Sequence, residues 1–411
     1  MPSTPTTSSP TEVEEGNGPV PKRLARTLYT YVFLEDFILL YPVYALLFTE
    51  HGLTAAEISS LFVIWSVTSF LLEVPAGVWA DMVSKRFLLS TASALVGCGF
   101  ALWTVLPSYP SFAVGFLLWG AGGALRSGTL QALAYEELEK AGAARSYTRL
   151  MGRARGLGTA AVALATALAS PVLALGGYGA VGMASIVVCA LGIVAGQALP
   201  ETAGASASSP DPEDEAHPIA LLKQGFAEVR ASRKVLGALV LASVTTGVEA
   251  MDEYLPLLVV DMGAADTMVP LLLLTVMGGM AAGQYCAEHG SDHWLGPVLL
   301  IGSALLAVGA LSGHPVGIVP VAVAFGAFEW ARVRTDALLQ SRIGNRTRAT
   351  VSSLAGLGME VVAVLVFAGY ALGSVWWGPS RLLAMAAVPY VFIAIVLICR
   401  APGSATGKPV R

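Results

Sequence analysis

Residues 77–86 read Gly-Val-Trp-Ala-Asp-Met-Val-Ser-Lys-Arg and separate two long apolar runs of the chain. An aspartate and two cations therefore end one hydrophobic segment and begin the next within a few residues. A helix that crosses a bilayer needs about 20 apolar residues, so this spacing predicts a tight hairpin at a membrane surface. Gly77 removes a side chain where the two helices are expected to approach closely. Asp81 ends a helix, where the macrodipole disfavours a carboxylate without a partner, so we expect it to bind another group.

The composition indicates a membrane protein rather than a soluble globular chain, because 55% of the 411 residues are hydrophobic and only 13% are charged. The formal net charge of -4 gives no reason to expect nucleic acid as a partner. The four cysteines are scattered, without the spacing of a disulfide framework or a metal site. We therefore expect no metal ion and no cofactor.

Long apolar runs recur along the sequence and predict twelve membrane-spanning helices. Six runs lie at about 27–49, 55–80, 87–106, 110–136, 148–175 and 178–199. Six more lie at about 235–260, 267–288, 295–313, 315–338, 348–373 and 380–400. We predict an all-α membrane protein with two pseudo-symmetric six-helix bundles, residues 22–200 and 235–400. A cytoplasmic linker at 201–234 joins them, a disordered cytoplasmic tail covers 1–21, and a second tail covers 401–411.

The distribution of lysine and arginine predicts which side of the membrane each loop faces, since cytoplasmic loops are enriched in both. If the chain starts inside, all but four of its 24 lysines and arginines lie on inner segments. The exceptions are Arg126, Arg332 and Arg334, inside predicted spans, and Arg381, near an outer end. We therefore predict a multi-pass protein of the cell membrane with both termini cytoplasmic. The excess of arginine over lysine and the abundant alanine suggest a bacterium with GC-rich DNA.

The hairpin at residues 77–86 resembles the loop between helices 2 and 3 of the major facilitator superfamily. That family's pattern, Gly-x-x-x-Asp-(Arg/Lys)-x-Gly-(Arg/Lys)-(Arg/Lys), is matched by Gly77, Asp81, Lys85 and Arg86. Met82 and Ser84 depart from it, which weakens the expected charge latch. The resemblance implies a twelve-span transporter that works by alternating access, with the four matching residues in a conformational-switch loop. We expect Asp81 to cap the helix that begins near Ala349–Ser353.

Charged residues inside the predicted spans mark the expected transport pathway. Eight of them are assigned to proton coupling or the substrate pathway: Glu35, Asp36, Arg126, Glu249, Asp252, Glu253, Glu329 and Arg332. A charged side chain at the centre of a bilayer costs about 2.5–3.5 kcal/mol, so eight left in lipid would cost on the order of 20 kcal/mol. They must therefore face one another or water. They fall on spans 1, 4, 7 and 10, which the resemblance places around a central cavity. The alternative is a set of fixed salt bridges that only hold helices together.

Span 1 is predicted to carry the carboxylate that couples transport to protons, either Glu35 or Asp36. Each lies about nine residues into a helix that starts inside, roughly 13 Å deep and near the midplane. Neighbouring helical positions point about 100° apart, so both cannot face the cavity centre equally. Glu249 is the matching residue of the second half, seven residues before Pro256, as Glu35 is seven before Pro42. Both prolines are expected to kink their spans.

These patterns favour a secondary active transporter that exports a small hydrophobic or amphiphilic compound, a drug or secondary metabolite, by proton antiport. Uptake of a small nutrient, or a transceptor that moves nothing, remains an alternative. An enzyme is not expected, because no predicted span contains a histidine and no nucleophile or metal-protease motif occurs. The expected partners are a small-molecule substrate, protons and the lipid bilayer, and we expect a monomer.

Overall fold

The computed structural model describes residues 18–201, 230, 232–343 and 348–400, and gives only the backbone for Asp81, residues 348–350 and Arg400. Most of the two expected tails and of the linker therefore lies outside the described residues. Within the described ranges the regular elements are helices, and no strand occurs among them. The fold class is all-α, as the apolar runs predict.

The helices divide into an N-terminal half and a C-terminal half. The N-terminal half contains α1 (Lys22–Asp36), α2 (Tyr44–Glu50), α3 (Ala55–Met82), α4 (Lys85–Val105), α5 (Tyr109–Arg126), α6 (Thr129–Lys140) and α7 (Tyr147–Ala198). The C-terminal half contains α9 (Arg233–Asp252), α10 (Leu255–Asp261), α11 (Val269–Cys286), α12 (Leu295–Ala310), α13 (Ile318–Arg342), α14 (Arg348–Gly373), α15 (Pro379–Ala386) and α16 (Val388–Arg400). Short 3-10 turns lie in several of the connections.

The described helices are consistent with twelve membrane passages. Nine helical stretches within the described ranges are long and apolar enough to cross a membrane. One of them includes all of α7, whose 52 residues form two passages that meet at Gly177 (φ 64°). Two further passages are broken helices, the pair α1 and α2 and the pair α5 and α6. Because of these breaks, helix length alone identifies fewer membrane passages than the apolar runs of the sequence do.

Side-chain caps and prolines set where several passages begin. Thr54 accepts from the backbone N–H of Glu57, whose carboxylate accepts in return from the backbone of Thr54, a capping box that starts α3. Ser84 and Ser232 cap α4 and α9, because the hydroxyl of each accepts a hydrogen bond from a backbone N–H in the first turn of its helix. Proline stands in the first turn of α5, α10, α11 and α15, where a backbone N–H has no partner within the helix, so its absence costs no hydrogen bond.

The first, fourth and seventh passages are interrupted between α1 and α2, between α5 and α6 and between α9 and α10, and the twelfth is divided at Ala387 between α15 and α16. The first is non-helical or turn-like over residues 37–43, which include Pro42, and the seventh is interrupted just before α10, whose second residue is Pro256. Both interruptions lie where the prolines predict them. The fourth passage breaks between α5 and α6 at Ser127 and Gly128, with Gly128 at φ 73°. This third break was not predicted, because no proline marks it and a single glycine is common inside membrane helices.

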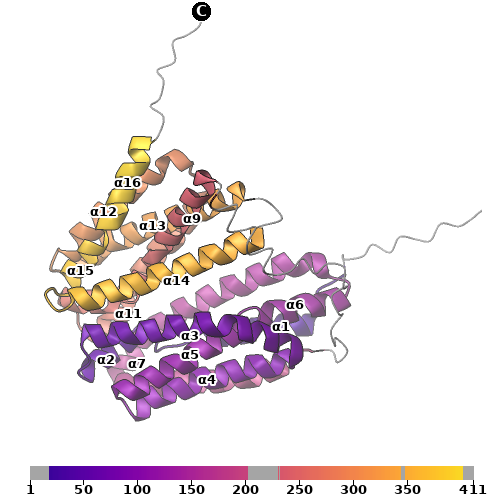
Figure 1. The fold of residues 1–411 in the computed structure, drawn as a ribbon. Coiled ribbons are helices and arrows are strands. Elements are labelled where there is room, and N and C mark those ends of the chain that lie inside the picture. The colour runs from indigo at the N-terminus through magenta and orange to yellow at the C-terminus, as the bar shows by residue number, and fades with distance from the viewer. Residues whose placement is uncertain (1–17, 202–229, 231, 344–347, 401–411) are drawn as a thin grey trace, which may run out of the picture.

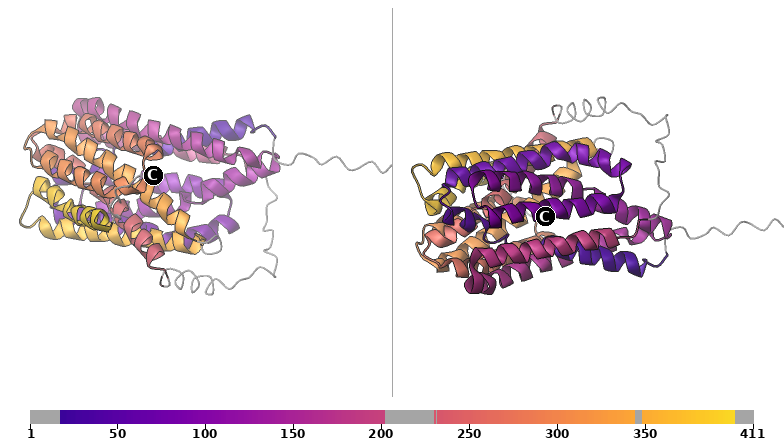
Figure 2. Two further views of the ribbon diagram at one scale, coloured as in Figure 1. Left: turned by 90° about the horizontal axis from the view of Figure 1, so that it is seen from above. Right: turned by 90° about the horizontal axis from the view of Figure 1, so that it is seen from below.

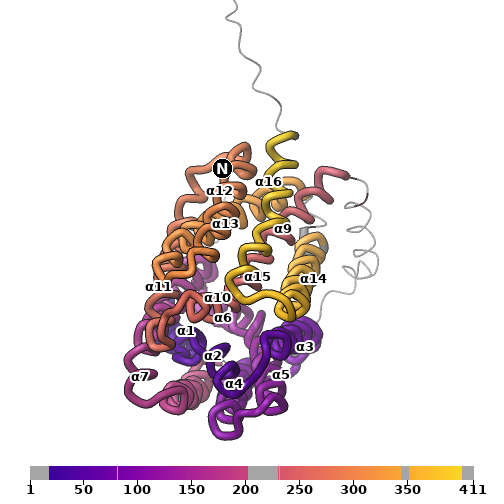
Figure 3. The backbone as a smooth tube through the Cα atoms, turned by 90° about the vertical axis from the view of Figure 1, so that its left-hand side faces the viewer, coloured from indigo at the N-terminus to yellow at the C-terminus, as the bar shows by residue number. Residues whose placement is uncertain are grey.

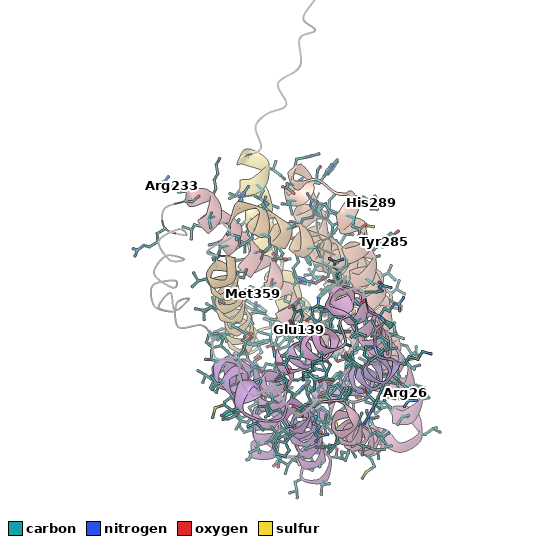
Figure 4. The ribbon with its side chains drawn as sticks, turned by 90° about the vertical axis from the view of Figure 1, so that its right-hand side faces the viewer. Arg26, Glu139, Arg233, Tyr285, His289 and Met359 are labelled. Atoms are coloured by element: carbon teal, nitrogen blue, oxygen red, sulfur yellow. The ribbon has the colours of Figure 1, made fainter. Side chains whose placement is uncertain are left out.

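The two halves lie one above the other in Figure 1, where α9 and α16 of the C-terminal half are tilted away from the helices of the N-terminal half, and Figure 2 shows the same bundle from above and below. We call the end that holds the starts of α1 and α9 the tail end, and the end that holds α2, α10 and α15 the far end. Figure 4 views the tail end, and its labels Arg26, Glu139, Arg233 and His289 mark starts or ends of four different passages. Across the halves, α3 packs on α14 and α7 packs on α11 (Figure 3).

The buried core shows that the halves are joined at the far end and have separate cores at the tail end. The largest cluster combines residues of both halves. Within it, Phe62 of α3 packs against Tyr254 and Phe367, with ring centroids 5.5 and 5.4 Å apart. Toward the tail end each cluster belongs to one half, one around Leu28 and another around Val235. Burial of apolar side chains therefore links the halves at one end of the bundle.

Candidate functional site

The charged residues of spans 1 and 4 form one group, the N-terminal charge cluster of Glu35, Asp36 and Arg126. Nη1 of Arg126 lies 3.7 Å from Oε2 of Glu35 and 3.4 Å from Oδ1 of Asp36. Glu35 also accepts a hydrogen bond from the hydroxyl of Ser93 on α4. One guanidinium therefore sits between two carboxylates that are adjacent in sequence. This arrangement is the mutual contact that the cost of charges in lipid predicts.

Helix ends position all three members of this cluster. Arg126 is the last residue of α5, where a cation interacts favourably with the helix dipole. Glu35 and Asp36 are the last two residues of α1, and they point to different neighbours. A Cβ added at Gly158 of α7 would collide with Oδ2 of Asp36, whereas a Cβ added at Gly192 would lie 3.4 Å from Oε1 of Glu35. The two carboxylates thus meet different parts of α7, although both contact Arg126.

Spans 7, 8 and 10 form the C-terminal charge cluster of Glu249, Gln284, Glu329 and Arg332. Nη2 of Arg332 lies 2.8 Å from Oε2 of Glu329, and Nε lies 3.4 Å from Oε1 of Glu249. Gln284 of α11 donates from Nε2 to Glu329 at 2.8 Å. The side chain of Glu329 is 1% exposed, so both of its partners offset the cost of burying a carboxylate.

The two charge clusters repeat one design in the two halves. In each, one arginine from span 4 or 10 lies between two carboxylates, at least one of which comes from span 1 or 7. The sequence predicts this grouping only in outline. Arg334, also on span 10, stands apart from it, since it pairs with Asp292 at 2.5 Å near the tail end.

A cavity of about 300 Å³ lies between the halves, formed by the first, fifth, seventh and eighth passages. Its polar lining includes Thr159 and Thr166 of α7 and Gln284 of α11. Asp252 and Glu253 also line it, so two of the predicted pathway residues face this space directly. Glu35, Asp36 and Arg126 are not among the described lining residues.

Aromatic and thioether groups make up much of the remaining cavity wall. Tyr41 and Tyr44 line it from the interrupted first passage, and Met277 and Met280 from α11. The ring of Tyr41 stacks on Trp119 with centroids 5.2 Å apart and planes 6° apart. A rigid aromatic face beside flexible methionines suits a ligand with an apolar body.

Hydrogen bonds cross between the halves beside this cavity. The hydroxyl of Tyr44 donates to Oε2 of Glu253, and the hydroxyls of Ser59 and Tyr254 lie 2.8 Å apart. Farther along the α3–α14 contact, a serine of α3 donates to the carboxylate of Glu360. Glu360 was missed in the sequence analysis, although a carboxylate inside the apolar run 348–373 is the same signal that identified the others.

Three residues of the hairpin between α3 and α4 contact carboxylates of their own half: Ser84, Lys85 and Arg86. Nζ of Lys85 lies 2.9 Å from Oε1 of Glu136, and Nε of Arg86 lies 3.6 Å from Oε2 of Glu201. Glu201 also accepts from the backbone N–H of Lys85 at 2.7 Å and from the hydroxyl of Ser84. Ser84, one of the two residues that depart from the family pattern, thus caps α4 and donates a hydrogen bond to Glu201.

Two predictions for this loop have different outcomes. The expectation that Gly77 marks a close helix contact is wrong in this structure, since a Cβ there would have nothing within 4 Å. The reason is that Ala76 and Ala80, rather than Gly77, face the neighbouring helices α4 and α5 at this end of α3. The predicted cap by Asp81 near residues 349–353 concerns a side chain outside the described residues and stays a prediction.

A second cavity of about 420 Å³ lies within the C-terminal half, between α9, α14, α15 and α16. Its wall is almost entirely apolar, and it contains none of the predicted pathway residues. Asp252, Glu253 and Gln284 therefore identify the smaller and more polar cavity between the halves as the candidate site.

Known structures resemble this chain in fold at low sequence identity. A variant of the nucleoside transporter NupG has a TM-score of 0.73 and 11% identity, covering 91% of this chain and 99% of its own. A bacterial homologue of the human lysosomal transporter Spinster, inward-facing and unoccupied, has a TM-score of 0.66 and 15% identity, covering 93% and 96%. The POT family transporter PepTSo has a TM-score of 0.65 and 14% identity, covering 93% and 98%.

Sequence comparison supports the same grouping. No curated protein matches the sequence. The sequence profile of the Major Facilitator Superfamily, however, matches residues 28–367, most of the chain. With the helical fold and the transporter structures that share it, this match shows that the chain is a multi-pass membrane protein that belongs to the Major Facilitator Superfamily.

Proposed function

We propose that this protein is a proton-coupled exporter that moves a small hydrophobic or amphiphilic compound by alternating access. The observation that carries the proposal is the polar cavity between the halves, flanked by an arginine–carboxylate cluster in each half. A path through a membrane protein needs polar groups at the interface of its two repeats, and the cavity provides them there. The apolar and aromatic part of its wall supports an amphiphilic substrate.

We place the protein in the cell membrane of a bacterium, with the tail end in the cytoplasm. The clustering of lysine and arginine on that end supports this orientation. Under it, the structure corresponds to a state with its outer end held shut, because the cores of the two halves merge only at the far end. The opposite state would require the contacts of Phe62, Tyr44 and Ser59 with the C-terminal half to separate.

We assign the coupling proton to the N-terminal charge cluster. Protonation of Glu35 or Asp36 removes one of the two negative charges that hold Arg126, and so weakens the contact between span 1 and span 4. Because span 1 also lines the cavity through Tyr41 and Tyr44, the charge state of the cluster can alter the cavity shape. Glu249 occupies the corresponding place in the second cluster and is the alternative carrier.

The test is a transport assay in proteoliposomes with an imposed pH gradient. Glu35→Gln, Asp36→Asn and Glu249→Gln are compared with Glu288→Gln, which removes an exposed carboxylate outside the cavity and both clusters. At least one cluster variant should lose gradient-driven transport while the control keeps it. Wild-type transport that ignores the gradient, or full activity in all three variants, would exclude coupling through these residues.

Uptake of a small polar nutrient is the second candidate, supported by the threonines and the glutamine in the cavity wall. It predicts accumulation with the reverse gradient direction in the same assay. A transceptor predicts binding of a ligand without movement across the bilayer, so the assay separates all three.

A further inference from the structure

The cavity between the halves has an unbalanced charge. Two carboxylates, Asp252 and Glu253, line it, and no lysine, arginine or histidine does so among its described lining residues. The neighbouring arginines do not correct the imbalance, because Arg126 and Arg332 each already lie between two carboxylates. Each charge cluster therefore holds more negative than positive groups, and the cavity wall adds two further carboxylates.

Asp252 and Glu253 differ in how their carboxylates are satisfied. Glu253 accepts a hydrogen bond from the hydroxyl of Tyr44, a partner without charge. Asp252 is exposed in the cavity and has no hydrogen bond or ion pair with any described residue. An ionised carboxylate without a partner, between the low-dielectric walls of a cavity, attracts a positive charge. The cavity therefore favours a positively charged ligand at Asp252.

The rest of the wall suits the body of an organic cation. The face of Tyr41 is fixed by its stacking on Trp119, and an aromatic face attracts a cation within about 6 Å. Met277 and Met280 supply polarisable, adaptable contacts for an apolar surface. An anion would meet two carboxylates and no counter-charge here, which the Coulomb interaction disfavours.

We propose that the substrate is a lipophilic organic cation, with its positive charge beside Asp252 and its apolar body against Tyr41, Met277 and Met280. This inference rests on the proposed function, because it names the chemical class that the same cavity accepts. It goes beyond hydrophobic or amphiphilic character, since it excludes anions and ranks uncharged compounds below cations of the same shape.

The probes are tetraphenylphosphonium and tetraphenylborate, which share size and shape and carry opposite charges. Binding to the purified full-length protein in detergent is measured by isothermal titration calorimetry at one pH and ionic strength. We expect tetraphenylphosphonium to bind at least about tenfold more tightly than tetraphenylborate, equivalent to about 1.4 kcal/mol. Equal affinity for the two ions, or tighter binding of the borate, overturns the proposal.

Variants then place the charge at Asp252. Asp252→Asn should weaken tetraphenylphosphonium binding about tenfold and leave the weak borate binding unchanged or stronger, whereas Asp252→Glu should keep most of the cation affinity. Glu288→Gln is the matched control, because it removes an exposed carboxylate outside the cavity. Unchanged cation affinity in Asp252→Asn, or an equal loss in Glu288→Gln, contradicts the assignment.

Transport in proteoliposomes separates this inference from the proposed function. Selective binding of the cation without any movement across the bilayer would support the cation site and refute the transporter. Movement of uncharged lipophilic compounds with no selectivity for the cation would support the transporter and refute the cation site.

Discussion

Tyr44→Phe tests what holds the far end of the bundle shut. The hydroxyl of Tyr44 donates to Glu253 across the two halves. Its ring is buried in the N-terminal half, where its centroid lies 6.0 Å from that of Phe62 and 5.8 Å from that of Trp119. Phenylalanine keeps the ring and removes only the bond to the other half. The variant should therefore fold normally and change the balance between conformations.

The size of that change follows from the type of bond. A hydrogen bond to a charged group contributes about 1.5–3 kcal/mol, and each 1.4 kcal/mol is a tenfold change in an equilibrium constant. The loss should shift the equilibrium toward a state opened at the far end by about 10- to 100-fold. If the wild type holds that state at about 1%, the variant should hold it at about 10–50%.

Double electron–electron resonance measures this population directly. Spin labels are placed at Leu106 of the N-terminal half and Leu311 of the C-terminal half, which are 61% and 58% exposed at far-end helix termini. The native cysteines are first replaced, since three of the four are exposed. We expect a longer-distance population that is weak in the wild type and prominent in Tyr44→Phe.

Tyr109→Phe is the control, because the hydroxyl of Tyr109 lies 2.8 Å from that of Ser60 within the N-terminal half. It removes one tyrosine hydroxyl bond without touching the contact between halves. An unchanged distance distribution in Tyr44→Phe, or the same shift in Tyr109→Phe, would refute the idea that the bond to Glu253 closes the far end.

Three further predictions concern other parts of the chain. Gly158→Ala should displace the carboxylate of Asp36 from its position beside Arg126 and so reduce transport. Gly156→Ala, which has open space, should leave transport unchanged, and equal effects would contradict the reasoning. Asp81→Asn should express normally and transport more slowly, so unchanged rates would remove any latch role from that carboxylate. Reporter fusions after Lys140 and after Ser232 should both read cytoplasmic, and a periplasmic reading at either point would overturn the orientation.

The membrane passages were predictable from sequence, because bilayer thickness imposes a length on every apolar run. The grouping of charges was predictable for the same reason, since Arg126 and Arg332 are too costly in lipid to lack partners. Their particular partners were not. Whether Arg126 contacts Glu35, Asp36 or both depends on how the ends of α1 and α5 approach, which the one-dimensional pattern does not contain.

Other features depend on contacts between distant segments or on the state of the protein. Glu136 contacts Lys85 and Glu201 contacts Arg86 from positions more than fifty residues away in the sequence, so no local sequence motif identifies these partners. Gly77 faces outward because Ala76 and Ala80 of the same turn pack against α4 and α5, a choice of helix face that the loop motif does not contain. The loop motif is shared by a family whose members adopt more than one conformation, whereas this structure shows a single conformation.

The turn at Gly177 has a consequence for how the protein enters the membrane. Only this residue departs from helical geometry between the two passages of α7, and its positive φ is one that glycine adopts without strain. Insertion of this hairpin therefore adds no loop beyond Gly177 to the free backbone groups of two helix ends, which limits the polar groups that meet the hydrocarbon layer. The fifth and sixth passages can accordingly be integrated together, as one unit, rather than one after the other.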